Sequence, residues 1–270
     1  MQKVFKELTT LFYRHDGMLS EEQYESIVMK HTTLLEDSDT IFILLQASGY
    51  PIEKENTKYL LKTYFTPYVE QQYCVIDIET NGSKPGTSQV IEIGAVKIKN
   101  GEIIDRFETF VECAFLPEYI TKITGIEPMD LVGAPTRRAA LIKLREFMDD
   151  SVFVAHNASF DHSFLNASFE RFGLGSIGNP TLCTINLAKR TFESERYGLA
   201  YLIDTLEIKT ATHHRAYSDA ICALKVMEKS LETIPEHVQT ADDLLKFSIS
   251  SKKERRVKKE EQFSCRKSEE

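Results

Sequence analysis

Two carboxylates with strand spacing are the residues of this sequence best suited to chemistry. Asp77 and Glu79 flank Ile78 in the stretch from Tyr73 to Glu79, whose β-branched and aromatic residues favour a strand. Alternate strand residues share a face, so the two acids would stand side by side, about 7 Å apart along the strand. They repel each other and cost desolvation, which a divalent cation relieves; oxygen-only ligands favour Mg²⁺ or Mn²⁺ over zinc. The alternative is that the strand ends at Ile78 and both acids are simply solvated.

Two further acids occupy places from which they could reach the same site. Asp161 lies in the first turn of a helix predicted over 159–172, just after a short apolar strand. Asp219 lies near the start of a helix predicted over 216–230. The helix dipole alone also favours acids at these positions. Strand ends and helix starts can nevertheless converge at one sheet edge, so a shared site is the competing interpretation.

A titratable base precedes the last of these acids. His213 and His214 come five or six residues before Asp219. An imidazole with a pKa of about 6.5 can take a proton from water at neutral pH. A histidine ahead of a helix is also a common surface residue, so both interpretations stay open on this pattern.

The elements that would position these residues form one mixed sheet. Three antiparallel strands are followed by alternating helices and strands, an α/β pattern in which helices cover the sheet. Asn100-Gly101 is a strong hairpin signal between the second and third strands. The predicted strands cover 73–79, 90–99, 102–112, 152–155 and 181–183, and the predicted helices cover 135–149, 159–172, 184–190, 199–206 and 216–230.

The flanking segments are assigned to separate units. Residues 1–68 are predicted to form a small helical domain, with a capping box at Ser20 and Gln23 and helices over 21–31, 39–47 and 53–65. Its role is unknown, and a partner-binding or regulatory domain is the simplest expectation. Residues 232–270 are predicted to form a basic tail that is disordered after about residue 250 and includes one short helix over 240–247.

Composition limits the classes of function. The net charge of −8 over 270 residues is unlike that of a purely electrostatic nucleic-acid binder, so phosphate would have to be neutralised locally, for instance by metal ions. The five cysteines are odd in number and form no CxxC pair, which argues against zinc and a disulfide framework. No secretion signal or membrane span is recognisable, and reduced thiols fit a cytoplasmic location without a membrane partner.

One glycine pattern is rejected as a cofactor signal. Residues 173–178 match G-x-G-x-x-G but follow a helix and run into Asn179-Pro180. A dinucleotide fingerprint requires a strand before it and a helix after it. We interpret this segment as a helix C-cap and loop.

Taken in order, the acidic motifs resemble those of the DEDDh, or DnaQ-like, 3′→5′ exonucleases. The first motif, Asp-x-Glu, matches Asp77-Ile78-Glu79. The second, His-Asn followed by Phe-Asp, matches residues 156–161, and the third, His-x-Ala-x-x-Asp-Ala, matches residues 214–220. Residues 123–126 are similar to the segment that this family has between its first two motifs. The resemblance covers about 72–231.

This resemblance implies a fold, a cofactor and a set of site residues. The fold would be RNase H-like, with a five-stranded mixed sheet and helices on its faces. Two Mg²⁺ ions, replaceable by Mn²⁺, would be held by the four acids, with Asp77 bridging them, and His214 would act as the base. Thr80 and Asn81 are also typical turn residues, and Phe160 a typical core residue. The residues expected to contact substrate are Thr80, Asn81, Ile123, Asn157, Phe160 and His214.

Three functions remain open. The first is a DNA proofreading exonuclease that resembles the epsilon subunit of bacterial DNA polymerase III, acts on a single-stranded or frayed 3′ end and releases nucleoside 5′-monophosphates. No polymerase domain is recognisable, so a polymerase catalytic subunit would be its partner. The second is an RNA exonuclease of the RNase T or oligoribonuclease type, which the 2′-hydroxyl would distinguish. The third is an inactive nucleic-acid-binding module, which predicts the loss of an acid or of the base.

Overall fold

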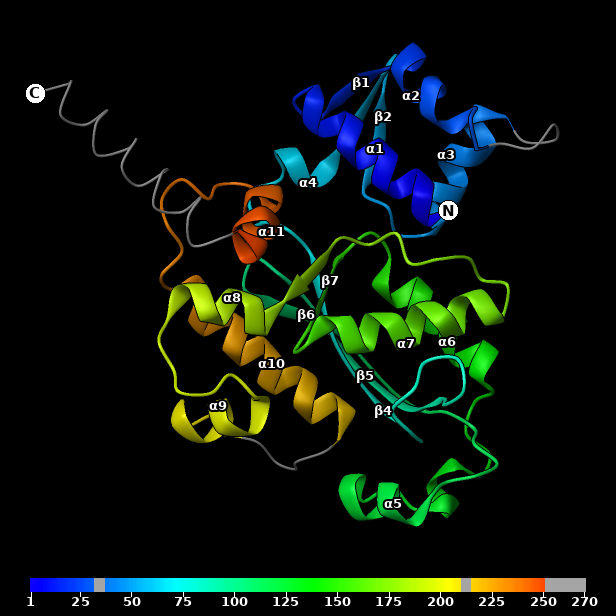
Figure 1. Ribbon diagram of the computed structural model, residues 1–270, viewed down its shortest axis with the longest axis vertical. Helices are drawn as coiled ribbons and strands as arrows, with labels where there is room; N and C mark the ends of the chain where they lie inside the picture. Colours follow the sequence, from blue (N-terminus) through cyan, green and yellow to red (C-terminus); the bar gives the residue numbers. More distant parts are fainter. Residues whose placement is uncertain (32–36, 210–214, 251–270) are drawn as a thin grey trace, which may run out of the picture.

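The computed structural model describes residues 1–31, 37–209 and 215–250. Within them the chain forms an N-terminal unit and a larger unit built on a five-stranded sheet (Figure 1). The N-terminal unit has its own hydrophobic core, made by residues between 4 and 61. None of the described helices is long and apolar enough to cross a membrane.

The large sheet has the order β6-β5-β4-β7-β8. Its first three strands are antiparallel, whereas β7 and β8 run parallel to β4. The β5–β6 hairpin turns at Asn100 and Gly101, which both have positive φ, as a two-residue turn of this kind requires. The strands are β4 (Tyr73–Thr80), β5 (Val90–Lys99), β6 (Glu102–Phe110), β7 (Val152–Ala155) and β8 (Thr181–Cys183).

Helices cover both faces of this sheet (Figure 1). One core lies between the sheet and α6 (Arg137–Met148) and α7 (Ala158–Arg171). A second core lies between the sheet and α8 (Thr184–Thr191), α10 (Ala216–Leu231) and α11 (Ala241–Ile249). The predicted mixed sheet flanked by helices is therefore confirmed. Three shorter elements complete this unit: α5 (Glu118–Thr124), the 3₁₀ helix η1 (Pro128–Leu131) and α9 (Leu199–Thr205).

The alternation along β4 decides which face carries chemistry. Ile76 and Ile78 point into the core shared with α6 and α7, whereas Tyr73 and Val75 point into the core shared with α8 and α10. Residues at odd positions of β4 therefore face α10, as the period of two in a strand requires. The remaining odd positions hold Asp77 and Glu79.

The N-terminal unit is not purely helical, which corrects part of the sequence prediction. It contains a three-stranded antiparallel sheet of order β1-β3-β2. The order of helix, strand, two helices and two strands, with this sheet, is that of a winged helix. Its elements are α1 (Gln2–Arg14), β1 (Met18–Ser20), α2 (Glu21–Val28), α3 (Ser38–Ala47), β2 (Ile52–Glu55), β3 (Lys58–Leu61) and α4 (Lys62–Phe65).

The helix predicted over 53–65 is present at Lys62–Phe65 but is wrong for residues 53–61. Strands β2 and β3 form a hairpin there, and Glu55 pairs with Lys58 across Asn56 and Thr57. Asn56 takes the left-handed conformation with φ of 54°, which asparagine tolerates better than most residues. Tyr59 is fully buried and stacks on Tyr24 at 3.9 Å between ring centroids. Long-range packing thus overrides the helical spacing of the apolar residues.

The N-terminal unit docks at the amino ends of β7 and β8. The backbone N–H of Gly178, just before β8, donates to the Ser48 carbonyl at 2.7 Å. A Cβ on Gly178 would lie 3.0 Å from that oxygen, so a larger residue would push the two segments apart by a few tenths of an ångström. Lys62 and Asp150 form an ion pair across the same boundary. The segment 173–178 is therefore a helix end and loop, as predicted, and its last glycine serves domain packing.

Residues 232–250 are a packed part of the molecule, which differs from the predicted tail. Val238, Leu244 and Phe247 join the core beneath α8 and α10. The short helix predicted over 240–247 is confirmed as α11, and the Thr240 side chain caps it by accepting from the Asp243 N–H at 3.1 Å. The basic block 252–259 lies outside the described residues.

Candidate active site

Three of the predicted acids meet at the carboxyl end of β4. One carboxylate oxygen from each of Asp77, Glu79 and Asp219 lies within 4.8 Å of the other two. The first two come from β4 and the third from the first turn of α10, which packs over this face. The ladder between β4 and β5 shifts register between Glu79 and Thr80, and bulges of this kind often re-aim side chains beside active sites.

The fourth acid, Asp161, is buried beside this group but outside the close trio. It lies in the first turn of α7 and is 3% exposed. Backbone hydrogen bonds to its carboxylate include one from Ile78, which places Asp161 against β4. The chain enters α7 through Asn157 in the left-handed conformation, with φ of 67°. This sharp turn places Asp161 in α7 close to the carboxyl end of β7.

Crowding and burial shift the titration of the acids upward. Burial raises the pKa of Asp77 well above its usual value, and the charges of Asp161, Asp219 and Glu79 raise it further. The pKa of Glu79 is raised to about 7 by burial and by Asp219, and that of Asp161 is raised to about 7 by burial. These shifts reflect first the burial of the carboxyl groups and, for Asp77 and Glu79, also the repulsion between like charges.

This carboxylate cluster fits divalent cations. Its oxygen-only ligand set suits Mg²⁺ or Mn²⁺, and a cation among the acids would offset both the loss of hydration and the repulsion between their charges. The four acids that would hold such ions are the ones that the sequence singled out. Their convergence makes metal-assisted hydrolysis the chemistry that this arrangement can best perform.

A fifth acid at this end of the sheet was missed by the sequence reasoning. Glu92 pairs with Glu79 across the β4–β5 ladder and is 1% exposed. Its carboxylate binds Arg215, with Oε1 3.0 Å from Nε and 2.8 Å from Nη2. An acid inside the apolar run from Val90 to Val96 is the signal that could have drawn attention to it.

The predicted base, His214, and its rival His213 lie outside the described residues. The chain resumes at Arg215, immediately before α10. The described histidine of the second motif, His156, has a structural role. Its Nδ1 lies 2.8 Å from the Thr184 hydroxyl and its Nε2 lies 2.9 Å from the Tyr197 carbonyl. Burial lowers the pKa of His156 to about 4, so its ring is neutral at physiological pH.

Thr80 and Asn81 follow the acids and use their side chains within the protein. The Thr80 hydroxyl donates to the Gly82 carbonyl at 2.8 Å. The Asn81 side chain accepts from the Gln89 N–H at 2.8 Å and donates to the Phe115 carbonyl at 3.1 Å. Both residues therefore shape the strand end.

The other three expected substrate contacts occupy different settings. Asn157 is exposed at the start of α7. Phe160 is partly buried and packs against Phe164, with ring centroids 4.9 Å apart. Ile123 is 54% exposed on α5, a helix that the sequence did not predict. Phe115, whose carbonyl is tied to Asn81, is 71% exposed and adds an aromatic side chain near the strand end.

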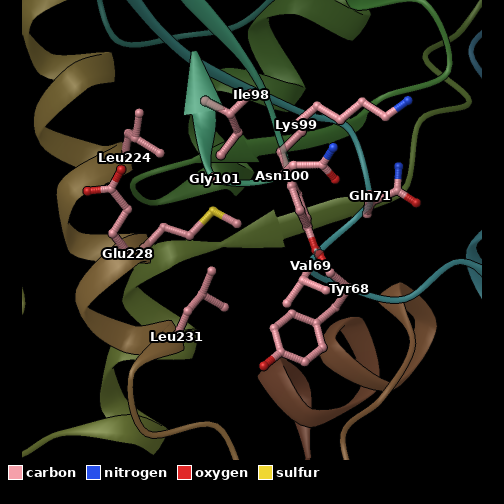
Figure 2. Close-up of a pocket in the computed structure, with 12 residues that line it drawn as sticks. Tyr68, Val69, Gln71, Ile98, Lys99, Asn100, Gly101, Leu224, Glu228 and Leu231 are labelled. Carbon is pink, nitrogen blue, oxygen red and sulfur yellow. The ribbon is translucent and has the colours of Figure 1, made fainter. Parts of the chain in front are cut away.

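The molecule also has a mainly apolar cleft of about 350 Å³ at the other end of the sheet. Figure 2 shows Leu224 and Leu231 of α10 facing the β5–β6 turn and the linker residue Tyr68. Ile98 in this cleft pairs with Tyr73, at the opposite end of β4 from Glu79. The cleft is thus separate from the carboxylate cluster, and its lining has no convergent set of acids.

Comparison with known families identifies the larger unit. A model of the exonuclease family matches residues 74–227, more than half of the chain. The chain therefore belongs to this family, and the resemblance to DnaQ-like exonucleases is confirmed. The matched residues contain Asp77, Glu79, Asp161 and Asp219.

Curated relatives of this chain include much longer proteins. The DNA polymerase III PolC-type of Caldanaerobacter subterraneus is 39% identical over 170 residues, which cover 62% of this chain and 12% of that protein. The corresponding protein of Staphylococcus haemolyticus is 36% identical over 196 residues, or 72% of this chain and 13% of that protein. The chain thus spans about one eighth of the length of these relatives.

Solved structures support the fold. A structure of exonuclease I has a TM-score of 0.55 and 17% identity, and the match covers 66% of this chain and 43% of that one. Escherichia coli exonuclease I in complex with a dT13 oligonucleotide has a TM-score of 0.54 and 17% identity, with 60% and 41% covered. At this identity the likeness concerns the fold, and it agrees with an RNase H-like sheet.

Proposed function

We propose that this protein is a metal-dependent 3′→5′ exonuclease that hydrolyses the terminal phosphodiester bond of a DNA strand and releases nucleoside 5′-monophosphates. The observation that carries the proposal is the meeting of Asp77, Glu79 and Asp219 within 4.8 Å, with Asp161 buried beside them. Membership of the exonuclease family supports the reaction class. The direction of digestion is inferred from the DEDDh motifs.

Each side chain has a task in this reaction. Asp77, Glu79, Asp161 and Asp219 would hold the divalent cations, Mg²⁺ or Mn²⁺ in its place. When bound, such cations would supply Lewis-acid chemistry, lowering the pKa of the attacking water and offsetting charge on the leaving oxygen. His214 accepts the proton from that water, a role assigned from the spacing between His214 and Asp219 in the third motif.

The substrate in this proposal is a single-stranded or frayed 3′ end. Thr80 and Asn81 form the strand end beside the acids, where backbone groups can meet the terminal nucleotide. Ile123, Asn157 and Phe160 surround its base and sugar. The exposed ring of Phe115, near the same strand end, is suited to stacking on an unpaired base.

Proofreading with a separate polymerase subunit is the cellular role that we propose. The relatives that match this chain are named as DNA polymerases, which favours DNA over RNA as the substrate. The described residues of the N-terminal unit contribute nothing to the carboxylate cluster and dock at the opposite end of the sheet. That placement leaves them free to bind a partner or to regulate the enzyme.

A labelled-strand assay tests the proposal. The full chain is incubated with 5′-labelled single-stranded DNA, with Mg²⁺ or with excess EDTA. We expect a ladder that shortens from the 3′ end only with Mg²⁺. Asp77→Ala should abolish the ladder, whereas Glu102→Ala, which removes an exposed acid at the other end of the sheet, should leave it unchanged.

The same assay separates the competing functions. Intact DNA in Mg²⁺ and in Mn²⁺ would overturn the DNA exonuclease, and digestion of RNA under those conditions would establish the RNA enzyme instead. A protein that binds both nucleic acids but cuts neither would be an inactive binding module. Preferential digestion of a mispaired primer end over a paired one is the result expected for proofreading.

A further inference from the structure

The buried acid Glu92 lies beside the carboxylate cluster without belonging to it. It is directly opposite Glu79 on β5, and its side chain shares the face that carries Asp77 and Glu79. At 1% exposure its carboxylate has lost its water, so it must be compensated by the protein. The hydrogen-bond partners of Glu92 therefore indicate its role.

Both carboxylate oxygens of Glu92 are occupied by the start of α10. Oε1 accepts two hydrogen bonds from the Arg215 guanidinium, and Oε2 accepts one from the Ala216 backbone N–H at 3.2 Å. The first amides of a helix have no partner within the helix, and a negative charge there also suits the helix dipole. Arg215 provides no side-chain cap for α10, so Glu92 supplies the cap from the neighbouring strand.

Two other contacts fix the same junction. The Arg215 guanidinium lies 5.2 Å from the ring centroid of Phe110 on β6, which restricts its direction. The first turn of α10 rests directly on the β5 backbone at Gly94. A Cβ on Gly94 would lie 2.0 Å from the Tyr217 nitrogen and 2.2 Å from the Ala216 carbonyl carbon. Glu92 and Gly94, two residues apart on one face of β5, thus hold the helix start from two sides.

The position of this helix start sets the position of Asp219. Asp219 comes three residues after Ala216, in the first turn of α10, and its carboxylate meets those of Asp77 and Glu79. Gly94 pairs with Asp77 in the ladder, so the contact surface for α10 adjoins the acids themselves. A small rotation of the first turn would withdraw Asp219 from the cluster.

We propose that Glu92 is a positioning residue, which locks the first turn of α10 through Arg215 and the Ala216 amide so that Asp219 completes the metal-binding cluster. This inference rests on the proposed function, because it assigns Asp219 to that cluster. Since both oxygens of Glu92 are occupied, it acts through Arg215 and α10 rather than as a ligand. Arg215 directly follows His214 in sequence, so the same lock also anchors the chain next to the candidate base.

The test compares Glu92→Gln with wild type in the full chain. The single amide oxygen of glutamine can accept from the Arg215 guanidinium or from the Ala216 N–H. The amide NH₂ group would then face the other donor, with which it forms no hydrogen bond. We expect Mn²⁺ binding without nucleic acid, followed by electron paramagnetic resonance, to weaken about 10–100-fold. On DNA, kcat should fall by a similar factor while KM for DNA stays within about twofold. Amide hydrogen exchange over 216–220 should become faster.

Three further variants separate positioning from charge and from misfolding. Glu108→Gln makes the same charge change on β6, where Glu108 is 55% exposed and 4.0 Å from Arg215, and should behave as wild type. Arg215→Lys keeps the charge but loses the forked donor, so it should fold and show an intermediate defect. The pair Glu92→Gln with Arg215→Gln restores charge balance without the lock, and its Mn²⁺ binding should stay weak.

Two results would overturn the assignment of Glu92. One is Mn²⁺ binding and exchange in Glu92→Gln that match Glu108→Gln, and the other is recovery of Mn²⁺ binding in the charge-balanced pair. A wild-type protein inactive on DNA and RNA would instead overturn the proposed function. In that case the Mn²⁺ and exchange measurements would still decide whether Glu92 positions Asp219.

Discussion

The two ends of the five-stranded sheet can be compared by how they hold buried polar groups. At the carboxyl end of β4, burial and the crowding of like charges raise the pKa values of Asp77 and Glu79. At the amino ends of β7 and β8, several buried polar groups are paired across the domain boundary, although the buried Asn179 Oδ1 has no hydrogen-bond partner among the described residues. There Arg145 donates to the Ser48 and Ser176 carbonyls at 2.9 and 3.2 Å and lies 4.2 Å from the Phe169 ring centroid.

The two ends therefore contribute to the stability of the folded state in opposite directions. Paired groups at the docking end stabilise the folded state, because removing either partner would leave the other buried and unsatisfied. Crowded acids at the other end destabilise it, because each would be better solvated in the unfolded chain. Substitutions at the two ends should therefore act on stability with opposite signs.

The largest expected effect is that of Asp77→Asn. We expect activity on DNA to fall by about 1000-fold or more, equivalent to about 4 kcal/mol of activation free energy. The protein without metal should melt at a higher temperature than wild type, because one of the mutually repelling charges has gone. Calorimetry in EDTA at pH 8 checks this. A lower melting temperature would contradict the claim that the crowded acids destabilise the folded protein.

The second prediction concerns pH. The raised carboxyl pKa values mean that the folded state binds protons more tightly than the unfolded state, so without metal the free energy of unfolding should fall as pH rises from about 5 to about 8. Divalent ions bind the deprotonated acids. Mn²⁺ affinity should therefore rise about tenfold between pH 6 and pH 8 for each proton displaced. Titrations of Mn²⁺ at several pH values measure this, and a flat profile would contradict the raised pKa values.

The third prediction concerns the amino ends of β7 and β8, where the N-terminal unit docks. Arg145→Ala should lower the free energy of unfolding by about 2–3 kcal/mol, because buried carbonyls lose their donor and Phe169 loses its cation. Activity per folded molecule should change by less than about twofold, since the carboxylate cluster lies at the other end. Arg138→Ala, which removes an exposed arginine from the same helix, is the control. Loss of activity in folded Arg145→Ala would mean that the two ends are coupled.

The smallest effect is expected for Tyr13→Phe. The Tyr13 hydroxyl donates to Asp242 at 2.6 Å, and Asp242 is 1% exposed. Removing this bond should cost about 1 kcal/mol of unfolding free energy, and less if Lys246, already paired with Asp242, compensates. Denaturant titration measures the loss. An unchanged midpoint would mean that this contact adds nothing to docking.

Local patterns in the sequence were sufficient to predict most of the larger unit. Strand alternation predicted that Asp77 and Glu79 share a face, and the Asn100-Gly101 signal predicted the β5–β6 turn. The order of the motifs predicted that Asp161 and Asp219 would reach the same place. The structure brings Asp219 into the close trio and buries Asp161 beside it. These features are local or repeat along the chain, so a single sequence displays them.

Other features of the fold depend on tertiary contacts that the sequence patterns did not predict. Residues 53–65 have helical spacing, yet residues 53–61 form a hairpin in which Tyr59 is buried against Tyr24, and only Lys62–Phe65 is helical. Spacing in the sequence predicted which acids would converge, because it follows the period of one strand and the starts of two helices. It did not determine that Glu92 binds Arg215, 123 residues away, or that Gly94 admits the start of α10. Such contacts depend on how elements approach one another in space, and no local periodicity records that approach.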